Sequence, residues 1–256
     1  MARNVIHNLL DVCLRLGVVL LLIALWVLGT TTGWLNPFFY GSPAGISGAM
    51  QEWMSSGQLW VDLGHSLSVL IGGMLVGTAM GVTLGVIFFA LPLFREAAEP
   101  VVAFANGFPR LILYPIFALM LGFSIEAKIL SVALVIIFLA MANTLAGLTE
   151  TDQRLLDGVR IAGGGRWDLA RLVYIPSIFT WLSAGSRASV GLAFQAVIVT
   201  EMIGSASGLG HMAALGQGTF NVNIILAAVS VMVVVAIVID LLLSLGEKRA
   251  LRWRQP

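Results

Sequence analysis

Six apolar stretches, each long enough to cross a lipid bilayer as a helix, constrain this sequence more than any other feature. A helix rises about 1.5 Å per residue, so roughly 20 residues span the ~30 Å hydrocarbon core of a bilayer. The stretches lie at about residues 16–35, 66–91, 101–123, 129–148, 178–203 and 224–245. Charged residues make up only 11% of the chain, against about 25% in soluble domains, which is too few to cover a globule in water. The sequence therefore predicts an all-α integral membrane protein with about six transmembrane helices, folded as a single domain over residues 1–256.

Basic residues are distributed unevenly between the two sides that six spans define. Those on one side are Arg3, Arg15, Arg95, Arg154, Arg160, Arg166, Arg171, Lys248, Arg249, Arg252 and Arg254. Only Lys128 falls on the other side. Because cytoplasmic loops carry an excess of Lys and Arg, this distribution predicts that both termini and the segment 149–176 face the cytoplasm.

A segment rich in glycine, serine and proline connects the first two stretches, at residues 36–65. Within it, Ile46, Met50 and Trp53 share one helical face. This spacing predicts a short helix that lies in the membrane interface.

The second stretch carries four glycines at a spacing of four residues: Gly73, Gly77, Gly81 and Gly85. Such a stripe has no side chains, so another helix can approach it closely and gain van der Waals contact. The stripe predicts close helix packing, either within one chain or at an interface between two subunits.

The segment 149–176 interrupts the apolar pattern with polar and charged residues. It is much longer than a connector between two helices needs to be. Residues 154–162 can form one short helix and residues 166–175 a second one that ends at Pro176, with three glycines between them. Asp157 and Arg160 occupy neighbouring positions on the first helix, among apolar residues. This mixture suits docking to a soluble partner, and the alternative is an interfacial loop that covers helix ends.

Motifs in this segment and elsewhere resemble those of ABC-importer permeases. Such permeases have an EAA-type loop, with the pattern Glu-Ala-Ala, a glycine, and an I-x-L-P-like ending. The residues of this chain that resemble it are Asp157-Gly158-Val159, Gly163, Arg166-Trp167 and Ile175-Pro176. More narrowly, the chain resembles permeases of the nitrate/sulfonate/taurine class, whose motifs it carries in the same order. These motifs are Ser42-Pro43, Ser56-Gly57-Gln58-Leu59-Trp60, Ser66-Leu67, Asn106-Gly107-Phe108-Pro109, Tyr114-Pro115, Leu121-Gly122-Phe123, Glu126-Ala127-Lys128-Ile129, Glu201-Met202-Ile203-Gly204 and Gly208-Leu209-Gly210. The chain departs from the family pattern at Asp157-Gly158-Val159, where the acidic charge is kept but Gly158 weakens the helix by about 1 kcal/mol relative to alanine.

The resemblance implies that the loop 149–176 is a coupling helix, which docks in a groove of a cytoplasmic ATP-binding subunit. The implied coupling residues are Asp157, Gly158, Arg160, Gly163, Arg166 and Trp167. The implied partners are two such ATP-binding subunits, a second copy of the chain, an extracytoplasmic substrate-binding protein and the lipid of a bacterial inner membrane. The implied solute is a small one, favoured to be an anion such as a sulfonate or a nitrate-like compound.

The residues themselves indicate that this chain is not the enzyme of such a complex. No G-x-x-x-x-G-K-[ST] motif occurs, so ATP hydrolysis is expected in a partner subunit and no cofactor is expected here. No nucleophile–base pair for catalysis is evident. A single cysteine and three histidines far apart in the topology indicate no metal site. The basic residues form no stripe, so no nucleic-acid partner is expected.

Arg110 is the most costly residue to place, because it lies inside the third apolar stretch. A central arginine costs about 2.5–3.5 kcal/mol on insertion scales and is expected to face a cavity or a partner. Pro109 and Pro115 flank it and would free backbone carbonyls, as the lining of a translocation path allows. The alternative is that its side chain reaches to the cytoplasmic interface.

Four further polar residues in the fourth and fifth stretches are candidates for the same path. Arg187 and Glu201 are separated by about 21 Å along the fifth stretch but fall on nearly one face of it. Asn143 and Gln195 can supply hydrogen bonds along the path. For these residues, hydrogen bonding between helices is an equally good interpretation.

The sequence thus favours the membrane subunit of an ATP-driven importer that works as a homodimer. Two alternatives from other classes are a membrane-embedded enzyme that acts on a lipid-borne substrate, and a self-contained channel or secondary carrier. Neither alternative needs a large cytoplasmic docking segment, so the segment 149–176 favours the importer.

Overall fold

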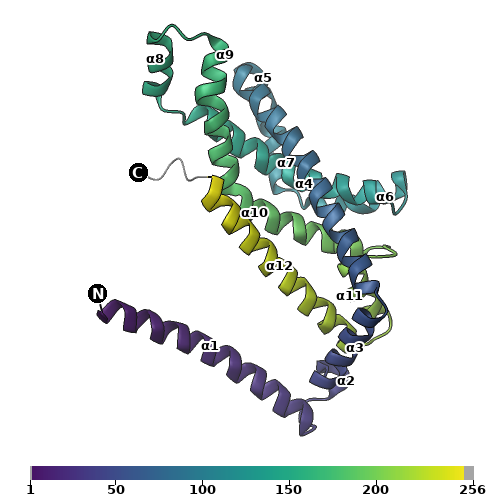
Figure 1. Ribbon diagram of the computed structural model, residues 1–256. Coiled ribbons are helices and arrows are strands. Elements are labelled where there is room, and N and C mark those ends of the chain that lie inside the picture. Colours follow the sequence, from purple (N-terminus) through teal and green to yellow (C-terminus); the bar gives the residue numbers. More distant parts are fainter. Residues whose placement is uncertain (1, 251–256) are drawn as a thin grey trace. The chain divides into compact units, whose positions relative to one another are not determined.

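The computed structural model describes residues 2–250, and these contain helices but no strand (Figure 1). They form two compact units. Unit 1 comprises the chain up to Gln58 together with Met212–Ser230, and unit 2 comprises Leu59–His211 together with the chain from Val231 onward. The prediction of an all-α membrane protein is confirmed, and the prediction of a single domain stays a prediction.

Within residues 2–250, four helices are long and apolar enough to cross a membrane, and they match four of the six predicted spans. They are α4 (Gln58–Ala90), α7 (Ile125–Thr149), the helix over Arg166–Met202, and α12 (Val222–Ala250), of which Val222–Gly246 is the apolar part. The first predicted span corresponds to α1 (Ala2–Thr31). The third predicted span differs from expectation.

The third span is not one continuous helix, so that prediction is wrong. Helix α5 (Pro92–Gly107) ends where Phe108 takes an extended conformation, because the ring of Pro109 disfavours helical backbone in the residue before it. A short 3₁₀ turn, η1 (Arg110–Leu113), follows and leads into α6 (Tyr114–Leu121). The break places Arg110 at a helix junction inside the apolar region.

The helix expected to end at Pro176 instead continues through that residue, which corrects a second prediction. Helix α9 (Arg166–Leu169), the π-helical turn η2 (Ala170–Tyr174) and α10 (Ile175–Met202) form one uninterrupted helix. The Ile175 N–H donates to the Ala170 carbonyl, five residues back. This wider turn directly precedes Pro176, which has no N–H of its own to donate, so the ladder adapts to the proline without ending.

The glycine stripe of α4 packs against α7 within the same chain, which answers the choice that the sequence left open. A Cβ atom added at Gly77 would lie 2.8 Å from the Ala133 carbonyl oxygen, and one at Gly81 would lie 2.5 Å from that of Ile137. The contacts advance together along both helices, so α4 and α7 run parallel. Their C-terminal ends define what we call the α8 end of unit 2, and their N-terminal ends the Lys128 end.

The core of unit 2 lies between α4, α7 and α10. Its buried residues are Val69, Leu70, Val132, Val135, Ile136, Ala140, Ala193, Ala196 and Val197. Helix α7 is the most buried of the four long helices, with half of its most apolar window inside the protein. It therefore forms the centre of unit 2 and positions the polar side chains described below.

Unit 1 contains α1, α2 (Pro37–Tyr40), α3 (Pro43–Ser55), most of α11 (Leu209–Gly218) and the start of α12. Asn36 caps α2 and Ser42 caps α3. The Asn223 side chain of α12 accepts the Ser42 N–H at 2.9 Å, which ties α12 to the start of α3. Helix α3 confirms the short helix predicted between the first two spans.

Candidate functional site

The loop that follows α7 forms an exposed helix with an amphipathic surface, α8 (Gln153–Ile161). Asp152 caps it by accepting the Arg154 N–H at 2.9 Å. Leu156 is buried, whereas Leu155 and Ile161 are exposed. Asp157 and Arg160 form an ion pair at 3.2 Å, and each side chain is 54% exposed. Helix α8 thus exposes both charged and apolar groups on its surface.

The three glycines after α8 build the tight turn that leads into the long helix. Gly163 has φ +81°, which a residue with a Cβ rarely adopts, and a Cβ at Gly164 would collide with Val159. The Gly165 N–H donates to the Asp168 carboxylate at 2.8 Å, which fixes the start of α9.

All six residues predicted to couple with an ATPase lie together on this projecting segment (Figure 1). They are Asp157, Gly158, Arg160, Gly163, Arg166 and Trp167, and all are exposed. Trp167, an apolar side chain of high exposure at 72%, adds to the surface that α8 offers. Their contact with an ATPase stays a prediction.

Arg110 lies against the middle of α7. Its guanidinium donates to the Val135 carbonyl at 3.1 Å and stacks 4.7 Å from the centre of the Phe138 ring. The next turn brings Tyr114, which is fully buried and whose hydroxyl has no hydrogen-bond partner among the described residues. Arg110 is therefore held inside the apolar region by a carbonyl and an aromatic face.

Asn143 and Gln195 occupy different surroundings. Asn143, on α7, faces α10 at Gly185, where an added Cβ would collide with its amide. Its Nδ2 has no hydrogen-bond partner among the described residues. Gln195 is exposed on α10. The close approach of the two helices at Gly185 makes Asn143 a packing contact as well as a candidate path residue.

Glu201 belongs to a buried polar cluster at the Lys128 end of unit 2, which the sequence did not reveal. The Ser66 hydroxyl donates to the Glu201 carboxylate and lies 2.8 Å from both of its oxygens. The Gly210 N–H donates to the same carboxylate at 3.0 Å. Glu201 is fully buried, so it exposes no surface to a path in this structure, and its role there stays a prediction.

Lys128 and Asp62 complete this cluster. The Lys128 ammonium contacts Ser205 Oγ at 2.6 Å and His65 Nε2 at 2.9 Å, and it is 2% exposed. Asp62 is fully buried and accepts the Gly208 N–H at 2.7 Å. The spacing of Asp62 and Ser66, four residues apart on one face of α4, was the sequence signal that could have indicated this cluster.

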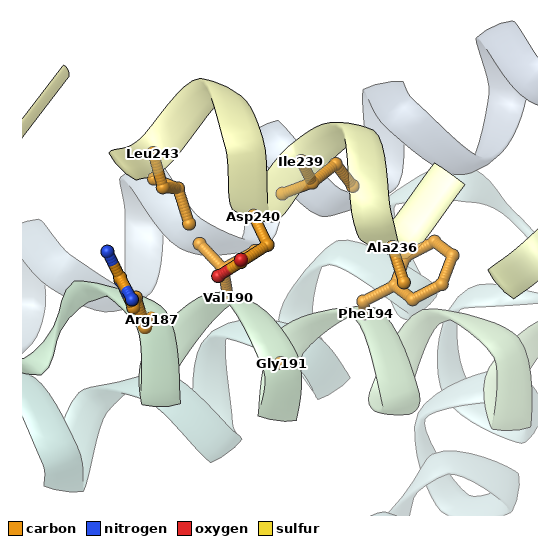
Figure 2. Close-up of a pocket in the computed structure, with 8 residues that line it drawn as sticks. All are labelled: Arg187, Val190, Gly191, Phe194, Ala236, Ile239, Asp240 and Leu243. Atoms are coloured by element: carbon orange, nitrogen blue, oxygen red, sulfur yellow. The ribbon is translucent and has the colours of Figure 1, made fainter. Parts of the chain in front are cut away.

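Arg187 lines a pocket of about 130 Å³ between α10 and α12 (Figure 2). Asp240 enters the same pocket from α12. The structure therefore does not gather the five predicted path residues into one cavity. Arg187 lies in this pocket, Glu201 in the buried cluster, and Arg110 against Val135 and Phe138 of α7.

The arrangement of helices is that of membrane subunits of ABC transporters. A crystal structure of an amino acid ABC transporter has a chain that matches with a TM-score of 0.63 over 78% of this chain and 97% of that one, at 17% identity. An inward-facing structure of the MetNI methionine ABC transporter matches with a TM-score of 0.59 over 80% and 98%, at 16% identity. These likenesses show the fold.

The sequence identifies the family. Residues 73–252 match the model of the binding-protein-dependent transport system inner membrane component, and the chain belongs to this family. It is 27% identical to the riboflavin transport system permease protein RibX of Chloroflexus aurantiacus, over 91% of this chain and 87% of RibX. It is also 27% identical to the putative aliphatic sulfonates transport permease protein SsuC of Bacillus subtilis, over 91% and 84%. The taurine transport system permease protein TauC of Escherichia coli is 22% identical, over 95% and 90%.

This membership makes the chain a multi-pass membrane permease of an ABC importer and confirms the predicted class. It also implies partners of two kinds, a substrate-binding protein and ATPase subunits. The resemblance to the nitrate/sulfonate/taurine class is confirmed by the relatives that match over nearly the whole chain.

Proposed function

We propose that this permease imports a small organic anion of the sulfonate type, with α8 as the element that couples transport to ATP hydrolysis in separate subunits. Both termini and the α8 end of unit 2 face the cytoplasm, and two copies of the chain enclose the path. The chain itself hydrolyses no ATP. Relatives named for sulfonates and taurine support the solute class, although another relative is named for riboflavin.

The observation that carries the proposed solute class is the guanidinium of Arg110 inside the apolar region. Arginine presents N–H donors in a planar fork, which matches the oxygens of an anionic group better than a point charge does. Irregular backbone at membrane depth is tolerated where it is buried in protein or lines a cavity. The break between α5 and α6 at Arg110 supports this assignment, because it is irregular backbone of this kind.

The continuous helix over Arg166–Met202 supports the coupling role of α8. It begins directly after the glycine turn that follows α8 and extends through unit 2 to Glu201. Because a helix is stiff along its axis, a displacement of α8 by closing ATPase subunits would move α10 as well. Helix α10 packs on α7, which also carries the groups that hold Arg110.

Uptake of a radiolabelled sulfonate into proteoliposomes that contain the full complex and its binding protein tests this proposal. Arg110→Gln should lose most of the uptake and keep basal ATP turnover, whereas Arg110→Lys should keep part of the uptake because it retains the charge. Arg95→Gln, on α5 outside the break, is the matched control and should transport like the parent. Parental uptake by Arg110→Gln would show that Arg110 only anchors η1 to α7.

A further inference from the structure

The pocket between α10 and α12 combines opposite charges with apolar walls (Figure 2). Arg187 reaches it from α10, and Asp240 reaches it from the facing side of α12. Both lie within apolar helices, where charged residues are rare and mark binding sites or solute pathways. The Arg187 guanidinium donates to Ser244 Oγ at 2.9 Å, which fixes its orientation. The guanidinium is thereby oriented on the pocket rim.

The remaining surface of the pocket is apolar and open at its centre. Its walls are Val190, Phe194, Ala236, Ile239 and Leu243. Gly191 lies between Arg187 and Phe194 on α10, and a Cβ atom built there would have no neighbour within 4 Å. The pocket volume of about 130 Å³ is several times the ~10–15 Å³ that one water molecule requires. The space therefore accepts a small solute with a short apolar spacer.

We propose that this pocket binds a zwitterion, with its anionic group at Arg187 and its ammonium group at Asp240. The inference rests on the proposed function and narrows its solute class to amino-sulfonates and similar molecules. Arginine has five N–H donors, so Arg187 can bind an anionic group while it keeps its contacts within the chain, the bond to Ser244 among them. The ethanolamine headgroup of a phospholipid has the same charge pattern. We assign the pocket to the solute and not to a lipid because it lies on α10, the helix that is continuous with the coupling segment. In the proposed function this helix moves with α8, so a solute bound to it would respond to ATP hydrolysis.

Direct binding to the purified permease–ATPase complex tests this assignment. The probes are radiolabelled taurine and isethionate, which share the sulfonate and the two-carbon spacer and differ only in ammonium against hydroxyl. The complex is held in nanodiscs of phosphatidylcholine and phosphatidylglycerol, with no ethanolamine lipid. The parent complex should bind taurine more tightly than isethionate. Asp240→Asn should weaken taurine about tenfold and leave isethionate nearly unchanged, and Arg187→Gln should weaken both by about tenfold. Asp240→Glu should retain the preference for taurine.

Gly191→Leu provides a steric test that does not depend on charge. The Cβ of the new side chain would meet no atom within 4 Å and the rest of it would occupy the pocket, so the complex should assemble normally and bind neither probe. Gly246→Leu is the matched control, because a Cβ at Gly246 also meets open space and Gly246 lines no part of this pocket. It should bind both probes like the parent. Elution volume and basal ATP turnover verify assembly of each variant.

Several outcomes would overturn the assignment. Parental taurine binding in Asp240→Asn or in Gly191→Leu would show that Asp240 and Arg187 only join α12 to α10. Loss of taurine binding on addition of ethanolamine lipid, with uptake unchanged, would assign the pocket to the lipid headgroup. Sulfonate uptake by a complex that shows no binding preference would reject this pocket and leave the proposed function intact. Absence of both uptake and binding would reject both.

Discussion

The two charged regions along α10 have similar residue types and opposite environments. At its C-terminal end, Glu201 is fully buried together with Lys128 and Asp62, and each of them has hydrogen-bond partners from other elements of unit 2. About four turns earlier on the same helix, Arg187 is exposed and shares an open pocket with Asp240. The acidic and basic groups of the cluster are enclosed by the protein, whereas Arg187 and Asp240 line an open pocket.

This difference teaches that charge inside a span does not by itself identify a solute site. A buried charge is tolerated when hydrogen bonds and opposite charges compensate for lost water. The cluster at the Lys128 end has this compensation, because three successive N–H groups at the start of α11 donate to Asp62, Ser66 and Glu201. Its role in the structure is to fasten the segment after α10 to the start of α4.

The largest predicted effect breaks this buried cluster. Lys128→Met should lower the free energy of unfolding by about 3–5 kcal/mol, because it removes the buried ammonium from beside two buried acidic groups and breaks its hydrogen bond to Ser205. Thermal denaturation of the detergent-purified protein measures the loss. Adding Glu201→Gln should recover part of it, since one of the two buried acidic groups is then replaced by a neutral amide. Arg187→Met, at the exposed pocket, should change stability by less than about 1 kcal/mol. Equal losses in the two single variants would contradict the comparison.

A second prediction concerns the close approach of α4 and α7, on which the position of the buried cluster depends. Gly81→Leu should destabilise the protein by about 1–3 kcal/mol or more, because its Cβ would meet the Ile137 carbonyl and the Ala140 side chain. The yield of monodisperse protein and its thermal midpoint measure this effect. Gly64→Leu, also on α4 but with open space around its Cβ, is the control and should keep the parental yield. A parental midpoint in Gly81→Leu would mean that the helices do not pack on this stripe.

The smallest predicted effect is a stabilisation of the exposed helix α8. Gly158→Ala should raise the stability of α8 by up to about 1 kcal/mol, because alanine is the better helix former and its Cβ would meet no neighbour. Amide hydrogen exchange of residues 153–161 measures it as slower exchange. Gly163→Ala should instead give faster exchange in these residues, since the positive φ of Gly163 strains any residue with a Cβ. Faster exchange in Gly158→Ala would show that Gly158 has a role that requires glycine.

Much of the fold followed from the sequence, because apolar length determines spans in a membrane. The two errors both arose at prolines. Apolar length predicted one span across Pro109, but the extended Phe108 before this proline ends α5. Pro176 was expected to end a helix, yet the π-helical turn before it lets the helix continue. Proline restricts the backbone locally, and only the packing around it decides whether a helix bends, breaks or adapts.

The candidate site was only partly predictable. The coupling residues form one continuous segment, so sequence order was enough to group them. The partners of Lys128 and Arg187 come from other helices: Lys128 contacts His65 and Ser205, and Arg187 contacts Ser244. Periodicity places a residue on a face of its own helix but does not determine which face of another helix it meets. For that reason the sequence indicated Lys128 only as an orientation signal.

ATP-driven uptake measured together with ATP hydrolysis tests most directly the central claim, that this permease is driven by separate ATPase subunits through α8. The pure chain should hydrolyse no ATP, and the complete complex in proteoliposomes should couple hydrolysis to uptake. Asp157→Lys reverses an exposed charge and breaks the ion pair with Arg160. It should leave the membrane fold intact, weaken ATPase assembly and abolish uptake. Hydrolysis by the pure chain, or parental uptake by Asp157→Lys, would contradict the account.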